Sequence, residues 1–236
     1  MINATRFATK RTIFLMCTVF LLAGCGGSDD SADDSNESTG STDNGSGTTG
    51  AKADFIFPFE KGQTWTVCQG YNTSDITHDG NLNYSLDFSL DADAAQGGTA
   101  CSFATANTST GQYVYAPADG RIMWHGLDSV PGINVDMTCI RLDETASNGA
   151  NSILLGHLNF SGFVSTLDQV KQGDLIGVVN APSVVNGAYA HIHISSHASS
   201  LCNDDSIPLN SVFGGSYNFT DNGNEQQWRG TTVSRD

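Results

Sequence analysis

The sequence predicts an all-β, mainly antiparallel domain of the sandwich or hairpin type over residues 54–236. Short runs rich in β-forming residues recur at intervals of about 8–15 residues and are separated by Gly, Asn and Asp, as in all-β sandwiches and barrels. Several runs alternate apolar and polar residues, which is typical of a strand with one buried face. Only Val164–Lys171 has a pattern that suits a helical turn.

The expected strands follow one another without an internal repeat or a second linker, so we expect one domain. Each run carries Val, Ile, Thr or aromatic residues and ends at a turn-forming residue. The alternation is clearest at Ile133, Val135, Met137 and Cys139. We expect strands at 64–67, 84–90, 112–115, 121–124, 133–142, 152–158, 175–179 and 190–195.

Residues 1–24 have the features of a bacterial lipoprotein signal peptide. A basic flank precedes the mostly apolar run 12–23, which is too short to span a bilayer as a helix. The run ends in a stretch that resembles a lipobox, Leu22-Ala23-Gly24-Cys25. The resemblance implies cleavage before Cys25 and membrane attachment through its acyl chains. Gly26 follows where an Asp would signal inner-membrane retention, so we expect an outer-membrane protein that faces the periplasm.

After Cys25, the segment up to residue 53 has the composition of a disordered tether. It consists largely of Ser, Asp, Gly, Thr and Asn, with almost no large apolar side chains. Such a segment cannot bury enough apolar surface to offset its loss of conformational entropy. The expected organisation is therefore a signal peptide at 1–24, a lipidated cysteine with its tether at 25–53, and one β domain at 54–236.

The charge of the chain argues against one class of partner. The 236 residues carry a formal net charge of −15, and residues 54–236 hold 19 acidic and 6 basic residues, a net charge of −13. A domain of this charge repels phosphate backbones, so we expect no nucleic-acid binding. We also expect a monomer.

The cysteines of the β domain suit an oxidising compartment. Cys68, Cys101, Cys139 and Cys202 are even in number and widely spaced, which favours two disulfides in one of three connectivities over a zinc cluster. We predict Cys68–Cys101 and Cys139–Cys202, because the strand of Cys139 and the strand before Cys202 are candidate neighbours.

A pair of histidines lies in the last of the expected strands. Residues two apart in a strand point to the same face, so His191 and His193 share one side while Ile192 and Ile194 face the core. Neutral imidazole is a common zinc ligand, and two of them on one face form half of a typical metal or acid–base site. On this segment alone, a histidine pair on a polar strand surface is an equally good interpretation.

Other residues can complete such a site. Asp87 stands between Leu86 and Phe88 in an expected strand, so it faces away from the core, and His78 lies nine residues earlier in a loop rich in Gly and Asn. Together with one histidine of the pair they would offer the ligand set N, O, N with an open fourth position, as in catalytic zinc sites. His157 by itself is more often a core histidine. His125 and His197 are not accompanied by other candidate ligands in the sequence, and we expect them at the surface.

In this order, the residues resemble the lysostaphin/LytM-type zinc metalloendopeptidases, particularly their staphylolysin-like branch. A His, an Asp in an apolar strand, a His-Leu segment and His-x-His follow one another. Two hairpin motifs of that family also have counterparts, Val114-Tyr115-Ala116-Pro117-Ala118-Asp119-Gly120-Arg121-Ile122 and Val170-Lys171-Gln172-Gly173-Asp174-Leu175-Ile176-Gly177. The hairpins occur in lipoyl-type carrier domains too, but the chain offers no suitably placed lysine. The similarity covers about residues 60–200.

The resemblance implies a role for each residue. It implies zinc ligands at His78, Asp87 and His193, and a catalytic pair at His157 and His191. The implied fold is a mainly antiparallel β domain of the duplicated-hybrid-motif type with a long substrate groove, and the implied activity is cleavage of peptide bonds in peptidoglycan. The alternative is an inactive module of the same fold that binds wall peptides or regulates another hydrolase.

Two segments depart from the family pattern. The family usually has its first His four residues before the Asp, and here that position is Asn83; the longer loop of the staphylolysin-like branch would accommodate His78 instead. The segment before His-x-His, 181–189, is bulkier and poorer in glycine than is usual. Because that segment borders the groove, it bears on substrate preference.

Overall fold

The computed structural model divides the chain into two units, Met1–Gly47 and Thr48–Asp236. The structure describes residues 54–73, 77–90, 108–130, 133–183, 189–214 and 216–236, all in the second unit. The signal peptide, Cys25 and the tether lie outside the described residues, and their boundaries at 24 and 53 stay predictions. In the part that is described, no helix has the length and the apolar composition needed to cross a membrane.

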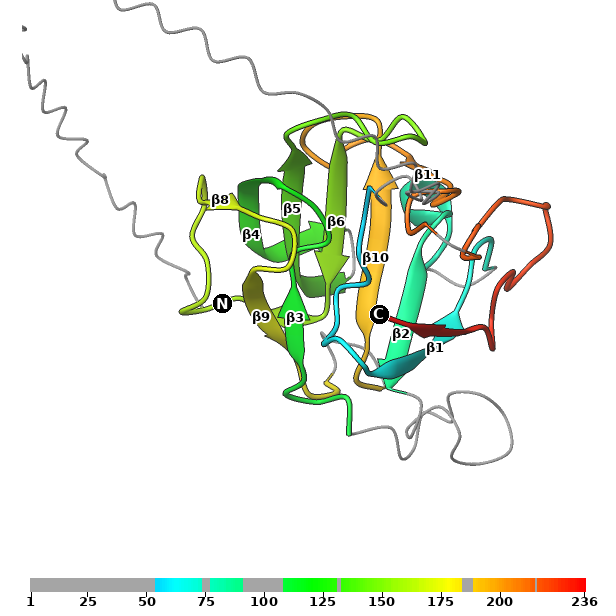
Figure 1. Cartoon of the computed structure of the whole chain (residues 1–236), viewed down its shortest axis with the longest axis horizontal. Helices are drawn as coiled ribbons and strands as arrows, with labels where there is room; N and C mark the ends of the chain where they lie inside the picture. Colours follow the sequence, from blue (N-terminus) through cyan, green and yellow to red (C-terminus); the bar gives the residue numbers. More distant parts are fainter. Residues whose placement is uncertain (1–53, 74–76, 91–107, 131–132, 184–188, 215) are drawn as a thin grey trace, which may run out of the picture. The chain divides into compact units, whose positions relative to one another are not determined.

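The predicted all-β, antiparallel fold is confirmed. Among the described residues, nine strands form one sheet, in which every pair is antiparallel. Figure 1 shows β10 near its centre, between β6 and β2. In sheet order the strands are β12 (Thr232–Ser234), β1 (Thr64–Gln69), β2 (Leu86–Leu90), β10 (Ile192–His197), β6 (Ser152–Gly156), β5 (Ile133–Leu142), β4 (Gly120–Val130) and β8 (Gln169–Val170), and β11 (Ser206–Ile207) also pairs with β10.

A second sheet of three strands completes the fold among the described residues. Its strands are antiparallel, in the order β3 (Tyr113–Tyr115), β9 (Leu175–Val179) and β7 (Leu158–Asn159). Side chains of both sheets belong to one hydrophobic core, for example Val114 and Ile176 from the small sheet and Ile140 and Leu155 from the large one. The arrangement is therefore two antiparallel sheets that share a core.

Most of the expected strands lie where the sequence places them. The strands at 133–142 and 175–179 have the expected bounds, whereas the run 152–158 is split into β6 and β7 at His157. His157 has a positive φ of 65°, which turns the chain out of the strand. Three short strands, β8, β11 and β12, and the 3-10 helix η1 (Gly80–Leu82) had no counterpart in the sequence prediction.

The helical turn expected at Val164–Lys171 is wrong. The segment consists of turns followed by β8. The side chain of Asp168 accepts a hydrogen bond from the backbone N–H of Ser165 at 2.7 Å, and Leu167 has a φ of 75°. These local bonds give the backbone an alternative to a helix, so the apolar spacing does not decide the structure here.

One face of the large sheet packs in the hydrophobic core, and the other carries the candidate site residues Asp87 and His193. Ile192 and Ile194 are completely buried in the main core, as the strand period predicts. On the opposite face, residues that pair across the strands run in two rows. The first row is Asp87, His193, Gly156 and Met137, and the second is Ser195, Leu154, Cys139 and Trp124. We call this the histidine face.

One predicted disulfide is confirmed. Cys139 of β5 and Cys202, in the loop after β10, are joined with a Cα–Cα distance of 6.0 Å. Cys68 is disulfide-bonded as well. Its predicted partner, Cys101, lies outside the described residues, so that pairing stays a prediction.

Candidate metal centre

Three of the predicted site residues lie together on the histidine face. His193 of β10 stands directly opposite Asp87 of β2, because the two strands are neighbours in the sheet. His78 comes from the loop that precedes η1 and lies over the same strand pair. One ligand atom from each of the three lies within 4.8 Å of the others. All three are buried, at most 3 % exposed.

The three side chains converge on one carboxylate oxygen. Oδ1 of Asp87 lies 3.0 Å from Nε2 of His78 and 2.9 Å from Nδ1 of His193. The rings of His78 and His193 meet edge to face, with centroids 5.1 Å apart. The result is a buried cluster of two imidazole nitrogens and one carboxylate oxygen, which is a donor set that zinc prefers.

The hydrogen bonding of His78 fits a metal ligand. Its Nδ1 lies 2.8 Å from the carbonyl oxygen of Gly70, and because a carbonyl only accepts, Nδ1 carries the hydrogen. In the neutral ring Nε2 then presents a lone pair to Asp87 Oδ1. Two acceptors at 3.0 Å repel each other unless a cation or a proton lies between them. A second hydrogen bond that fixes the ring in this way is typical of metal-binding histidines.

His193 carries a similar signal. Its Nδ1 faces Asp87, while its buried Nε2 has no hydrogen-bond partner among the described residues. Burial lowers the pKa of His193, although the hydrogen bond with Asp87 opposes that effect. The neutral form that a metal ligand requires is thereby favoured.

Asp87 is anionic in this environment. Burial by itself would raise its pKa, but the charges of His78 and His191 and hydrogen bonds from His193 and His78 hold the pKa well below its usual range. Its second oxygen, Oδ2, accepts a hydrogen bond from the hydroxyl of Tyr189 at 3.2 Å and lies 3.4 Å from Nε2 of His191. Only Oδ1 faces both histidines of the cluster.

The two predicted catalytic histidines lie side by side at the edge of this cluster. The ring of His157 lies 4.0 Å from that of His191, centroid to centroid. Nδ1 of His191 donates to the carbonyl oxygen of Tyr189 at 2.8 Å, so its Nε2 is the atom left to accept a proton. Tyr189 also stacks on the same ring at 4.3 Å.

His157 is held in place by its backbone. Its N–H donates to the carbonyl oxygen of Asp136 at 2.8 Å, and its own carbonyl oxygen accepts from the N–H of Asn180 at 2.9 Å. The side chains of Asp136 and Asn180 are joined at 3.0 Å. Burial, and then the neighbouring His191, lower the pKa of His157 well below its usual range, and its buried Nδ1 has no partner among the described residues. The ring is therefore neutral and able to accept a proton.

Two histidines were expected at the surface, and one of these predictions is wrong. His125 is exposed, as expected. His197 is buried, at 1 % exposure. Its Nδ1 donates to the carbonyl oxygen of Asp204 at 3.0 Å and its Nε2 accepts from the hydroxyl of Ser195 at 3.0 Å. It belongs to the histidine face because residue 197 has the same strand parity as 191 and 193, and β10 extends that far.

Sequence reasoning missed several residues that shape the centre. Tyr189 precedes the strand and Gly156 precedes His157, and no sequence motif marks either of them as part of a site. Asn83, the residue at the family's usual spacing, bonds elsewhere: its side-chain amide donates to Asn72 at 2.5 Å. The sequence alone does not distinguish a polar residue that takes part in the metal centre from one, such as Asn83, that lies near a candidate ligand and bonds to another residue.

No protein-family model and no curated protein matches the chain. The solved structures that it resembles include peptidases of the M23 family. A candidate M23 peptidase from Pseudomonas aeruginosa is 19 % identical, with 70 % of this chain and 52 % of that chain covered and a TM-score of 0.39. The catalytic domain of lysostaphin from Staphylococcus simulans is 16 % identical, with 64 % and 88 % covered and a TM-score of 0.38.

Another similar structure is a variant of the catalytic domain of the prophage-encoded M23 protein EnpA from Enterococcus faecalis. It is 18 % identical, with 65 % of this chain and 94 % of that chain covered and a TM-score of 0.41. This chain spans about half of the Pseudomonas protein. Likeness at this level carries no conclusion about activity, so the function is argued from the geometry of the centre itself.

Proposed function

We propose that this protein is a zinc-dependent endopeptidase that cleaves peptides of peptidoglycan. The observation that carries the proposal is the convergence of His78, Asp87 and His193 on one point of the histidine face, beside the adjacent rings of His157 and His191. The sequence motifs that resemble the lysostaphin/LytM-type enzymes imply zinc ligands at the same three residues and a catalytic pair at His157 and His191. The geometry and the resemblance are independent observations that support one site.

The ligand set proposed for zinc is Nε2 of His78, Oδ1 of Asp87 and Nδ1 of His193. A zinc ion bound there would polarise a water molecule and lower its pKa towards about 7. Three protein ligands leave a fourth position open, as catalytic zinc sites do.

The chain's own residues supply the proton transfers of the proposed hydrolysis. As water oxygen bonds to the carbonyl carbon of the scissile peptide, Nε2 of His191 accepts the water's proton, since Nδ1 of that ring is already committed to Tyr189. His157, neutral and next to His191, is the other candidate base. When the carbon–nitrogen bond breaks, the protonated imidazole returns the proton to the leaving amine.

Digestion of purified sacculi tests the proposal directly. The zinc-loaded protein should release soluble peptide fragments, a chelator should stop the release, and added zinc should restore it. Mass analysis of the fragments identifies the bond. A His193→Ala variant is the matched control. Binding of sacculi without any release of fragments would instead favour the inactive, peptidoglycan-binding module.

The location is a separate part of the proposal. We propose that acyl chains on Cys25 anchor the protein in the outer membrane, facing the periplasm, and that a coil of residues 26–53 lets the domain reach the wall over a distance of about 30 Å. Cys25→Ser should leave an uncleaved or mislocalised precursor. Normal membrane fractionation of that variant would contradict the anchor without affecting the proposed chemistry.

A further inference from the structure

A pocket of about 470 Å³ lies on the histidine face, next to the candidate metal centre. Met137 and Leu154 form its apolar floor, and Trp124 lies beside them. One wall is the segment Asp79–Leu82, and the other is the loop 201–204 after β10. None of these residues has a role in the chemistry proposed above.

Two of the residues that line the pocket, Asp79 and Met137, are close neighbours of candidate metal ligands. Asp79 directly follows the candidate ligand His78. Met137 pairs with Gly156, which in turn pairs with the candidate ligand His193. A peptide held at the centre with its backbone along the histidine face therefore brings the side chain of a nearby residue to the pocket.

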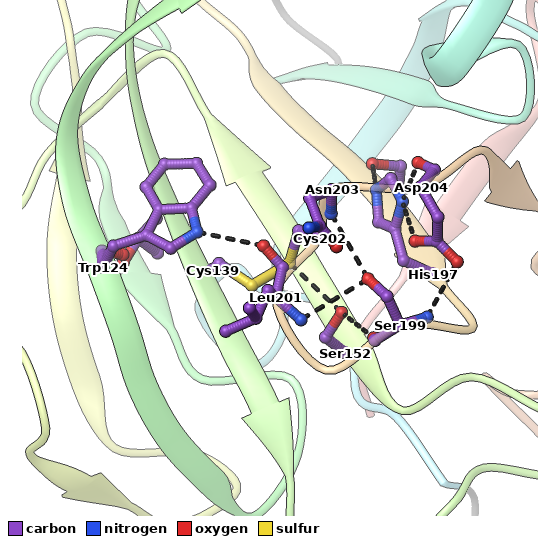
Figure 2. The surroundings of a disulfide bond; sticks show 11 residues. Trp124, Cys139, Ser152, His197, Ser199, Leu201, Cys202, Asn203 and Asp204 are labelled. Carbon is purple, nitrogen blue, oxygen red and sulfur yellow. Dashed lines mark hydrogen bonds and ion pairs between the residues drawn. A yellow bond between two sulfur atoms is a disulfide. The ribbon is translucent and has the colours of Figure 1, made fainter.

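The loop 201–204 is a fixed wall. The disulfide Cys139–Cys202 ties it to β5, and Nε1 of Trp124 donates to the carbonyl oxygen of Leu201 at 3.0 Å, as Figure 2 shows. The hydroxyl of Ser152 donates to the carbonyl oxygen of Ser199 at 2.7 Å. These bonds hold the first half of the loop and the residues before it against the sheet, so this wall of the pocket is built into the fold.

The charged residues that line the pocket are all acidic. Asp79 and Asp204 line it, and no Lys or Arg is among its described lining residues. Oδ2 of Asp204 accepts from the backbone N–H of Ser199 at 2.8 Å, and its Oδ1 lies 3.4 Å from Nδ1 of His197, which donates to the carbonyl oxygen of Asp204. His197, which also lines the pocket, stays neutral because burial lowers its pKa.

We propose that this pocket binds an aliphatic side chain that ends in a primary ammonium group, on a residue near the scissile bond of the substrate. The methylene stem would pack on Met137 and Leu154, and the ammonium group would lie between the carboxylates of Asp79 and Asp204. The inference rests on the proposed function, since it assumes that a peptide occupies the histidine face. It adds a selection for a basic residue that the metal centre itself does not make.

Peptide binding to the chelator-treated full chain tests this selection without any cleavage. The probes are fluorescent alanine pentapeptides with one lysine at each position in turn. Each has a counterpart with norleucine, which has the same carbon chain but no amine. At one position or more, fluorescence anisotropy should give a dissociation constant about three- to tenfold lower for lysine than for norleucine, the range of a partly exposed ion pair.

Matched variants separate the pocket from the general negative charge of the domain. Asp79→Asn combined with Asp204→Asn should remove the lysine preference, and the amide introduced by Asp204→Asn would keep an oxygen to accept from Ser199. Asp205→Asn removes a charge next to Asp204 on an exposed residue that does not line the pocket, and it should keep the preference. Melting temperatures verify that the variants fold.

Equal affinities for lysine and norleucine at every position would overturn the inference, as would an unchanged preference in the double variant. Either result leaves the proposed function intact if sacculi are still cleaved. Conversely, a lysine preference that depends on Asp79 and Asp204, in a protein that cleaves no sacculi, would support the pocket and contradict the proposed enzyme.

Discussion

His193 and Gly156 face each other across β10 and β6, and a Cβ atom on Gly156 would lie 3.2 Å from the Cβ of His193. This is closer than ordinary van der Waals contact, so a side chain at position 156 must push the candidate ligand aside. The φ of Gly156 is not positive, and the backbone would accept an alanine. The limited space beside His193, and not the backbone conformation, is what favours glycine at this position.

Gly156→Ala should therefore weaken zinc binding while the protein stays folded. We expect the dissociation constant for zinc to rise about 10- to 100-fold, the range usual for residues that orient a metal ligand. Competition with a chromophoric chelator measures it. Gly156→Val should have a larger effect, and an unchanged affinity in both variants would mean that His193 does not bind the metal.

His78→Ala and Asn83→Ala distinguish the two candidates for the first ligand. His78 faces Asp87 with its ring fixed by the Gly70 carbonyl, whereas the side chain of Asn83 is bonded to Asn72. We expect His78→Ala to lose its zinc and Asn83→Ala to retain it. Metal analysis of the two purified variants decides the question. Full zinc content in His78→Ala would contradict the ligand set.

The histidine pair should separate metal binding from catalysis. His157→Ala and His191→Ala each remove a candidate base but none of the proposed ligands, so zinc content should stay close to one per chain. The rate of fragment release from sacculi should fall about 10²–10⁴-fold, as for the loss of a general base. Loss of zinc in His191→Ala, with zinc retained in His193→Ala, would reverse the roles along β10.

The sequence pattern predicts which face of the sheet His191 and His193 occupy. It does not predict which other strands contribute residues to that face. The period of two places His191 and His193 opposite Ile192 and Ile194, and the structure agrees. The pairing of β2 with β10 joins residues more than a hundred positions apart, which no local pattern encodes. The grouping of Asp87 with these histidines rests on the chemistry of their donor atoms and on the resemblance, not on periodicity.

The remaining errors have local causes. His197 was expected at the surface because no motif includes it, yet it has the parity of His193, and Asp204 and Ser195 satisfy both of its ring nitrogens. The pattern at Val164–Lys171 suits a helix, but the hydrogen bond from Ser165 to Asp168 closes a turn instead. In both cases short polar contacts, which sequence periodicity does not register, determine the structure.

Removal of the Cys139–Cys202 disulfide should destabilise the domain substantially. The bond closes a loop with a sequence separation of 63, for which the loss of chain entropy in the unfolded state corresponds to about 4 kcal/mol. The double variant Cys139→Ala, Cys202→Ala should unfold at a clearly lower urea concentration than the parent. A midpoint within error of the parent would mean that the loop 201–204 is held by its hydrogen bonds alone.

His197 should make the stability of the domain depend on pH. Burial lowers its pKa in the folded state, and the hydrogen bond and charge of Asp204 only partly oppose this. In the unfolded chain the imidazole has its ordinary pKa of about 6.5. Between the two values the unfolded state binds a proton that the folded state does not.

The free energy of unfolding should consequently be fully present above a pH of about 6.5 and should decrease as the pH falls towards the folded pKa, by at most about 1.4 kcal/mol per pH unit from this one group. Urea denaturation of the chelator-treated protein at a pH of about 7.5 and at about 5, on either side of the ordinary imidazole pKa, measures the decrease. His193 and His157 contribute in the same direction, so the comparison is with His197→Asn, which keeps both of them. The variant should lose less stability on acidification than the parent. Equal losses in the two proteins would show that His197 takes up its proton in the folded state as readily as in the unfolded one, which would require the bonds to Asp204 and Ser195 to rearrange.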